Sequence, residues 1–285
     1  MLNVEIQEEE GVIFFIDYNL TTPYHEMAYY AIKSFKKYNK NIPVALILCN
    51  DDENKVKNKC ESIVEYLIEI PQFVDTFGRN KKISNFNQIY WASPFAKNIY
   101  FDCDFLICNT VDSWFDYLNT KDIIFLKNSL DFRGMIKKHN YQDFFSRIKL
   151  NYVNNHIMFF NKRSNVSLEF FNLLTQIQAN YKTFYKNFLD LKIENQDIRI
   201  DLSLCLKLSD NEDKILNKLI LYQDLIPTKI NYTDIDKRDF YKFTNLWFVP
   251  NSKVKFENYI QLFPIHYGNF KFLNKEFKKS LDELL

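Results

Sequence analysis

Two carboxylates separated by one residue, Asp102 and Asp104, are the side chains of this sequence most clearly suited to a chemical role. They follow the short apolar run 98–101, which is typical of a buried strand. Two carboxylates at the end of one strand can converge on a divalent cation, and such hard oxygen ligands suit Mg²⁺ or Mn²⁺. A divalent ion neutralises a diphosphate and makes it a better leaving group. The pair therefore predicts a metal site that acts on a diphosphate.

A second acidic triplet, Asp234 to Asp236, serves as an internal comparison. It lies among Asn231, Thr233 and Lys237, with no apolar strand before it. We therefore predict a loop there, and we expect Asp234→Asn to be nearly silent.

The elements that must position Asp102 alternate between strand and helix. Short apolar runs are typical of strands buried on both faces, and apolar spacings of three and four are typical of helices. The order β-α-β-α-β indicates a parallel sheet with helices on its faces. The expected elements are strands at 12–16, 44–48, 64–70, 98–101, 123–126, 157–160 and 259–265, and helices at 27–38, 52–63, 82–92, 168–179 and 198–208.

Three acidic side chains fall at the ends of these predicted strands: Asp17, Asp51 and Asp102. Ligands of open parallel sheets bind at the carboxyl ends of the strands. The strand ends therefore predict one polar rim that contains the site.

The segment around Asp102 also resembles a known family. Residues 98–107 read Asn-Ile-Tyr-Phe-Asp-Cys-Asp-Phe-Leu-Ile, and residues 111–115 read Val-Asp-Ser-Trp-Phe. Together with the step Ser93 to Phe95, this is similar to the Asp-x-Asp segment of glycosyltransferase family 8 and its relatives. The resemblance implies a GT-A α/β fold, a nucleotide-diphosphate sugar donor and a hydroxyl acceptor, with retention of anomeric configuration.

The C-terminal stretch 266–271 fits a second motif of that family, His-x-x-Gly-x-x-Lys. The resemblance implies that His266 is a metal ligand beside Asp102 and Asp104, and that Gly268 and Lys271 hold the donor diphosphate. A neutral imidazole also suits manganese chemically. The family continues with Pro-Trp, whereas Phe-Leu follows here, so the local packing must differ.

Further donor contacts are expected from Asp17 and Tyr18 at the end of the first strand, where the family holds the base and ribose. Lys82, at the start of a predicted helix, stands where relatives carry a basic residue near the donor. A cation beside a helix N-terminus suits a phosphate.

Two segments depart from the family pattern. Residues 154–160 resemble its Asn-x-Gly strand, which lines the sugar site, but His156 stands where glycine is usual. Residues 194–197 resemble its Asp-Gln region beneath the anomeric carbon, with the order reversed to Gln196 and Asp197. Asp197 and its rival Asp201 are the candidate catalytic carboxylates.

Composition excludes several other classes. The net charge is +1 with no long basic block, so a nucleic-acid partner is not expected. Only four glycines are present, and neither the P-loop nor the Gly-x-Gly-x-x-Gly motif occurs. The five scattered cysteines suggest a reducing compartment, and no signal segment or membrane span is found. We therefore expect a cytoplasmic protein.

The sequence thus predicts one GT-A domain over 1–285, with a nucleotide-sugar-binding half at 1–110 and an acceptor-side half at 111–285. The predicted function is glycosyl transfer from a UDP-sugar to a glycan or other hydroxyl acceptor, with Mn²⁺ or Mg²⁺. One alternative is a sugar nucleotidyltransferase. Proteins of that class normally carry a Gly-rich, basic phosphate-binding loop after the first strand, whereas residues 17–24 contain neither Gly nor Lys. The other is a transferase-like carbohydrate-binding protein without turnover.

Overall fold

The computed structural model describes residues 2–18, 21–72, 85–126, 129–137, 154–179, 233–234, 247–249, 253–256, 259–268 and 270–285. The predicted helix at 198–208 lies outside these ranges.

Three parallel strands begin the main sheet: β1 (Glu8–Asp17), β2 (Val44–Cys49) and β3 (Tyr66–Glu69). The helices α1 (Tyr24–Tyr38) and α2 (Lys55–Cys60) connect them. The apolar runs of β1 and β2 are buried, as expected for strands covered on both faces. The predicted β-α-β-α-β order is confirmed.

The other half of the main sheet contains β4 (Phe95–Phe101), β9 (Asn154–Asn161) and β6 (Ile123–Leu126). The strand order is β3-β2-β1-β4-β9-β6. β4 is parallel to β1, whereas β9 is antiparallel to both of its neighbours. The prediction of an α/β fold with a largely parallel central sheet is therefore confirmed.

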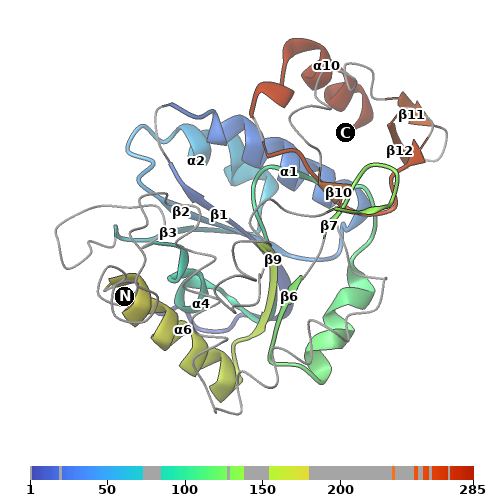
Figure 1. Cartoon of the computed structure of the whole chain (residues 1–285). Helices are drawn as coiled ribbons and strands as arrows, with labels where there is room; N and C mark the ends of the chain where they lie inside the picture. The colour runs from blue at the N-terminus through green and yellow to red at the C-terminus, as the bar shows by residue number, and fades with distance from the viewer. Residues whose placement is uncertain are drawn as a thin grey trace, which may run out of the picture.

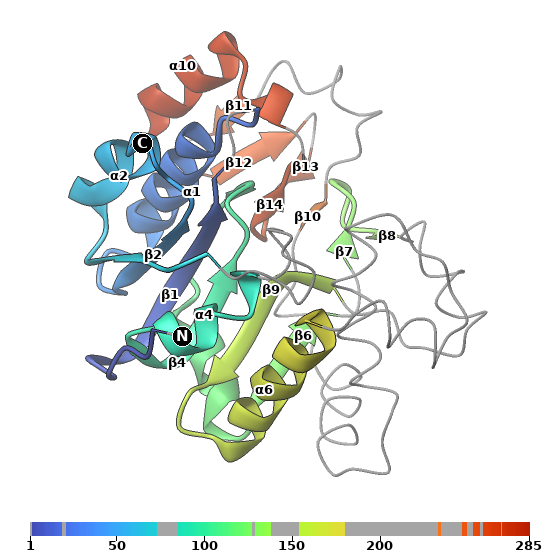
Figure 2. The ribbon, with the colours of Figure 1, turned by 90° about the vertical axis from the view of Figure 1, so that its left-hand side faces the viewer.

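Helices cover both faces of this sheet (Figures 1 and 2). α1, α2, the 3-10 helix η2 (Asp112–Asn119) and α10 (Lys275–Leu284) contribute to one buried apolar cluster. α4 (Ile89–Ala92) and α6 (Asn165–Ala179) contribute to a second cluster on the opposite face. The alternating side chains of β1 supply both clusters, because successive residues of a strand point to opposite faces.

A small second sheet lies beyond the end of β4 and gathers segments that are distant in the sequence. Its strands, in spatial order, are β5 (Phe105–Leu106), β14 (Ile265–His266), β10 (Thr233–Asp234), β7 (Ser129–Leu130) and β8 (Ile136–Lys137). β14 pairs antiparallel to β5 and parallel to β10. This sheet connects the C-terminal motif to the Asp102 segment.

Two sequence predictions are wrong in this region. Asp234 is not in a loop, because Thr233 and Asp234 form β10 between β14 and β7. The single strand expected over 259–265 is interrupted: Tyr259–Ile260 is β13, and β14 begins only at Ile265. β13 belongs instead to a third sheet with β12 (Lys253–Phe256) and β11 (Trp247–Val249).

The remaining described elements are short. The 3-10 helix η1 (Glu61–Ile63) extends α2, so the two together cover most of the predicted helix 52–63. The 3-10 helix η5 (Phe270–Phe272) precedes α10. Across the described ranges, no helix is both long and apolar enough to cross a membrane.

Candidate functional site

The site forms where the main sheet meets the second sheet. β4 ends at Phe101, and the chain passes through Asp102 and Asp104 into β5. β5 pairs with β14 in a register that sets His266 opposite Phe105. The backbone amide of Tyr267 also donates to the carbonyl oxygen of Asp104, at 3.1 Å. Sheet pairing therefore brings together the two motifs that the sequence singled out.

His266 is buried and lies between two carboxylates. Its Nε2 is 3.2 Å from Oδ2 of Asp104, and its Nδ1 is 3.0 Å from Oδ1 of Asp234. Burial alone lowers the pKa of His266, but the charges and hydrogen bonds of Asp104 and Asp234 outweigh it and raise the pKa to about 10. The two carboxylates therefore favour the protonated form of His266.

Asp234 is itself held from the other side by Lys137 of β8, whose Nζ lies 2.6 Å from Oδ2 of Asp234. Burial raises the pKa of Asp234, but hydrogen bonding and charge from His266 and Lys137 lower it well below its usual range. Asp234 therefore fixes the Nδ1 edge of the His266 ring.

Asp102 is held by its strand neighbours. Tyr100 donates a hydrogen bond to Oδ1 of Asp102, and Nδ1 of His156 lies 2.6 Å from Oδ2. The backbone amide of Asp102 donates to the carbonyl oxygen of His156, at 3.0 Å. The β4–β9 register, with Phe101 opposite Ile157, sets His156 beside Asp102.

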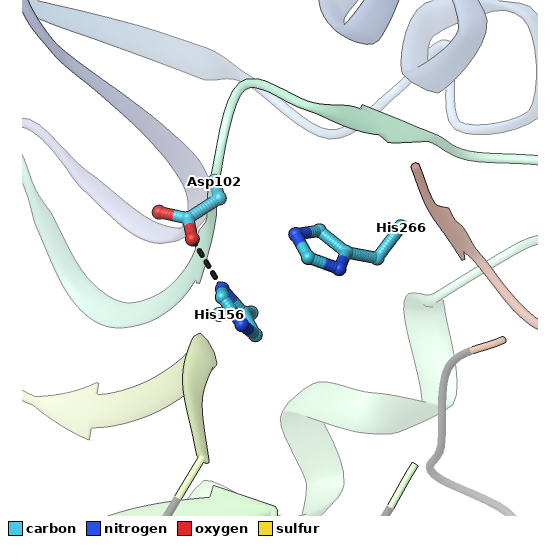
Figure 3. Close-up of side chains that lie close together, drawn as sticks. All are labelled: Asp102, His156 and His266. Carbon is cyan, nitrogen blue, oxygen red and sulfur yellow. Dashed lines mark hydrogen bonds and ion pairs between the residues drawn. The ribbon is translucent and has the colours of Figure 1, made fainter. Parts of the chain in front are cut away.

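The rings of His156 and His266 are stacked, with centroids 4.1 Å apart and planes inclined by 30°. Figure 3 shows the two imidazoles beside the carboxylate of Asp102. One ligand atom from each of Asp102, His156 and His266 lies within 4.8 Å of the others. This is the one such group of possible metal ligands among the described residues.

The donor set fits a divalent ion. Imidazole nitrogen and carboxylate oxygen bind such ions at about 2.0–2.2 Å, so two ligands of one ion lie up to about 4 Å apart. The ligand atoms of Asp102, His156 and His266, within 4.8 Å of one another, would need to move only slightly closer together to bind one ion. Because a metal ligand must be deprotonated, an ion would compete with the proton that the two carboxylates favour on His266.

Asp17 ends β1 as predicted and is buried at 6% exposure. Its two carboxylate oxygens accept hydrogen bonds from the side-chain amides of Asn50 and Asn85, at 2.6 and 2.9 Å. The ring of Tyr18 is 8% exposed and packs in the apolar cluster with α1. Base stacking by Tyr18 would need this ring to move, and the donor role of both residues stays a prediction.

Gly268 has φ +54°, a left-handed conformation that favours glycine. A Cβ there would lie 3.4 Å from Cε1 of His266, an ordinary contact distance, so the backbone conformation rather than a lack of space favours glycine. Lys271 lies in η5, but its side chain is outside the described set. Lys82, Asp197 and Asp201 are also outside it.

Sequence reasoning missed two members of the site. The sequence marks His156 only as a departure from a glycine pattern, and it predicts a loop at Asp234. A signal for Asp234 was present in principle, because a buried histidine that binds metal through one nitrogen usually donates through the other to a carboxylate. The sequence did not indicate which carboxylate this would be.

No known protein-family model matches this sequence, and no curated protein is similar to it. Solved structures are similar in fold. Mouse xyloside xylosyltransferase 1, apo form, is 9% identical, with 92% of this chain and 98% of that chain covered and a TM-score of 0.52. An active-site mutant of LgtC is 12% identical, with 96% and 94% covered and a TM-score of 0.52.

The apo structure of the bifunctional glycosyltransferase WbbM is 12% identical, with 99% of this chain and 52% of that chain covered and a TM-score of 0.51. These proteins share the GT-A fold. The chain therefore has the GT-A fold that the Asp102 and His266 segments predicted.

Proposed function

We propose that this protein is a glycosyltransferase that moves a sugar from a nucleotide-diphosphate donor, a UDP-sugar, to a hydroxyl of a glycan or other acceptor. The observation that carries the proposal is the convergence of Asp102, His156 and His266 at the carboxyl edge of a GT-A sheet, with Asp104 lying 3.2 Å from His266. Ligands of open α/β sheets bind at that edge.

Asp102, Asp104 and His266 would hold a divalent ion, Mn²⁺ or Mg²⁺. When bound, such an ion neutralises the donor diphosphate and makes it a better leaving group. Asp234 fixes the His266 ring through Nδ1, so Nε2, which faces Asp104, is the nitrogen available to the ion. Tyr100 fixes the carboxylate of Asp102 from within the main sheet. The ligands are therefore oriented before a donor arrives, which reduces the cost of binding it.

The residues proposed to contact the donor directly belong to the same edge of the main sheet. The turn at Gly268 presents backbone beside His266, and Lys271 follows three residues later in η5. We assign Gly268 and Lys271 to the diphosphate, with Lys82 as a further cation near it. Asp17 and Tyr18, at the end of the adjacent strand β1, are assigned to the nucleoside.

Transfer is proposed to retain the anomeric configuration. The leaving diphosphate can then accept the proton of the acceptor hydroxyl on the same face of the sugar, so no protein base is required. Asp197 or Asp201 would stabilise positive charge near the anomeric carbon. The segment 121–151, which includes β6, β7 and β8, is proposed to shape the acceptor site.

A thermal-shift screen of nucleotide sugars with and without Mn²⁺ tests this proposal. A ligand that binds only the folded state stabilises it by RT ln(1 + [L]/Kd), so the true donor should raise the melting temperature in a concentration-dependent way. The donor found should then be turned over, with release of UDP. Asp104→Asn should lose both the Mn²⁺-dependent shift and turnover.

Two outcomes would contradict the proposal. A donor that stabilises the protein but is never turned over, with a panel of glycan acceptors present, would indicate a carbohydrate-binding protein. Formation of a nucleotide sugar and pyrophosphate from a sugar phosphate and a nucleoside triphosphate would indicate a nucleotidyltransferase.

A further inference from the structure

We propose that His156 is a direct ligand of the divalent ion, and that the resulting pair of imidazoles makes the site prefer Zn²⁺ and Co²⁺ over Mg²⁺. This inference rests on the proposed ion site at Asp102 and His266. It adds a residue that replaces the expected glycine, and it assigns the class of ion that the site selects.

The backbone fixes His156 next to Asp102. Phe101 and Ile157 are paired across β4 and β9, and the amide of Asp102 donates to the carbonyl oxygen of His156. The backbone at position 156 therefore cannot move away from Asp102 without breaking the main sheet. A side chain of imidazole length at this position reaches the same space as the carboxylate.

The ring of His156 is oriented by two contacts. Its Nδ1 lies 2.6 Å from Oδ2 of Asp102, and its face stacks on His266 at 4.1 Å. In either tautomer of the neutral ring, one of the two nitrogens keeps a lone pair for a cation. Carboxylate–histidine pairs of this kind orient metal-binding imidazoles.

The site is open to an incoming ion from the His156 side. The side chains of His156 and Asp102 are 30% and 32% exposed, whereas that of His266 is 9% exposed. The ligand atoms of these residues already lie within 4.8 Å of one another (Figure 3). His156 and Asp102 are therefore the ligands that an incoming ion would meet first.

The second imidazole changes which ion binds best. Imidazole nitrogen suits Zn²⁺, Co²⁺ and related transition ions, whereas oxygen ligands suit Mg²⁺. A site with Asp102, Asp104 and one imidazole is rich in oxygen. A site that also contains His156 gains a nitrogen ligand, so we expect affinity in the order Zn²⁺, Co²⁺, Mn²⁺ and last Mg²⁺.

Isothermal titration of the full-length protein with Zn²⁺, Co²⁺, Mn²⁺ and Mg²⁺, without donor, tests this. His156→Phe keeps a flat ring to stack on His266 but removes both nitrogens. The matched control is His25→Phe, since the His25 side chain is 29% exposed and lies on α1. We expect His156→Phe to lose about tenfold or more in Zn²⁺ and Co²⁺ affinity, with Mg²⁺ affinity changing far less. His25→Phe should leave all four affinities unchanged.

Pulsed electron paramagnetic resonance of bound Mn²⁺ separates a ligand from a residue that merely supports Asp102. The modulation from ¹⁴N should report two coordinated imidazoles in the unsubstituted protein and one in His156→Phe. An equal loss of affinity for all four ions in His156→Phe would overturn the inference while leaving the proposed ion site intact. A single coordinated imidazole in both the unsubstituted protein and His156→Phe would do the same. If the unsubstituted protein binds none of the ions, both the inference and the ion site are wrong.

Discussion

Oδ1 of Asp234 lies 3.0 Å from Nδ1 of His266, on the side of the ring opposite Asp104. With Lys137 against Asp234, a chain of alternating charge crosses the second sheet from β8 to the end of β4. Each side chain in this row restricts the rotation of the next. The orientation of the His266 ring is therefore set by residues distant from it in the sequence.

Replacing Asp234 should weaken ion binding, whereas the sequence alone predicts that Asp234→Asn has almost no effect. Asp234→Asn removes the charge that orients His266, and loss of such a supporting carboxylate typically costs about 10–100-fold in metal affinity or activity. Titration calorimetry with Mn²⁺ measures the effect. Asp116→Asn, on the exposed face of η2, is the matched control and should change nothing. Unchanged Mn²⁺ affinity together with a lower melting temperature would make Asp234 a purely structural residue.

Chelation and Asp104→Asn should each abolish donor turnover while leaving the fold intact. The amide keeps the shape of the carboxylate but removes the charge that attracts the cation. Far-ultraviolet circular dichroism checks the fold, and release of UDP from the donor checks turnover. Full turnover in excess chelator would show that the reaction needs no divalent ion.

Lys271→Ala should lower turnover more than it weakens donor binding. A cation that meets charge developing on the leaving diphosphate stabilises the transition state more than the ground state. The separate effects on kcat and on the donor dissociation constant measure this difference. Lys279→Ala, whose side chain is 80% exposed, is the control. If Lys271→Ala turns over saturating donor as fast as the unsubstituted protein, Lys271 has no role in the reaction.

The buried elements of the main sheet could be predicted from sequence, because their signal is local. The runs within β1 and β2 are continuously apolar, and the spacing of Met27, Ala31 and Phe35 marks α1. Asp102 could be located for the same reason, since it directly follows a buried strand. The polar rim followed from a general property of parallel sheets.

The second sheet could not be predicted, because its strands are two residues long and owe their existence to pairing with distant segments. Asp234 has no apolar run beside it, and it becomes part of the site only through the parallel pairing of β10 with β14. The sequence shows His156 at a position where the resembling family has glycine. Its contact with Asp102 depends on the β4–β9 register, which no local pattern specifies.

The stereochemical outcome provides an independent test of the reaction. Proton nuclear magnetic resonance of the product formed from an α-linked donor should show an α linkage. Asp197→Asn should slow transfer without eliminating it, because electrostatic stabilisation by one group contributes about a few kcal/mol. A β-linked product, or complete loss of transfer in Asp197→Asn, would indicate an inverting reaction with a protein base.

The most direct test of the ion site is anomalous diffraction from a crystal of the protein grown with Mn²⁺ and UDP. The proposed ion site predicts a manganese peak in contact with Asp102, Asp104, His156 and His266 and with the diphosphate of UDP. A crystal that contains UDP at the sheet edge with no manganese at these residues, or manganese bound only elsewhere, would contradict it.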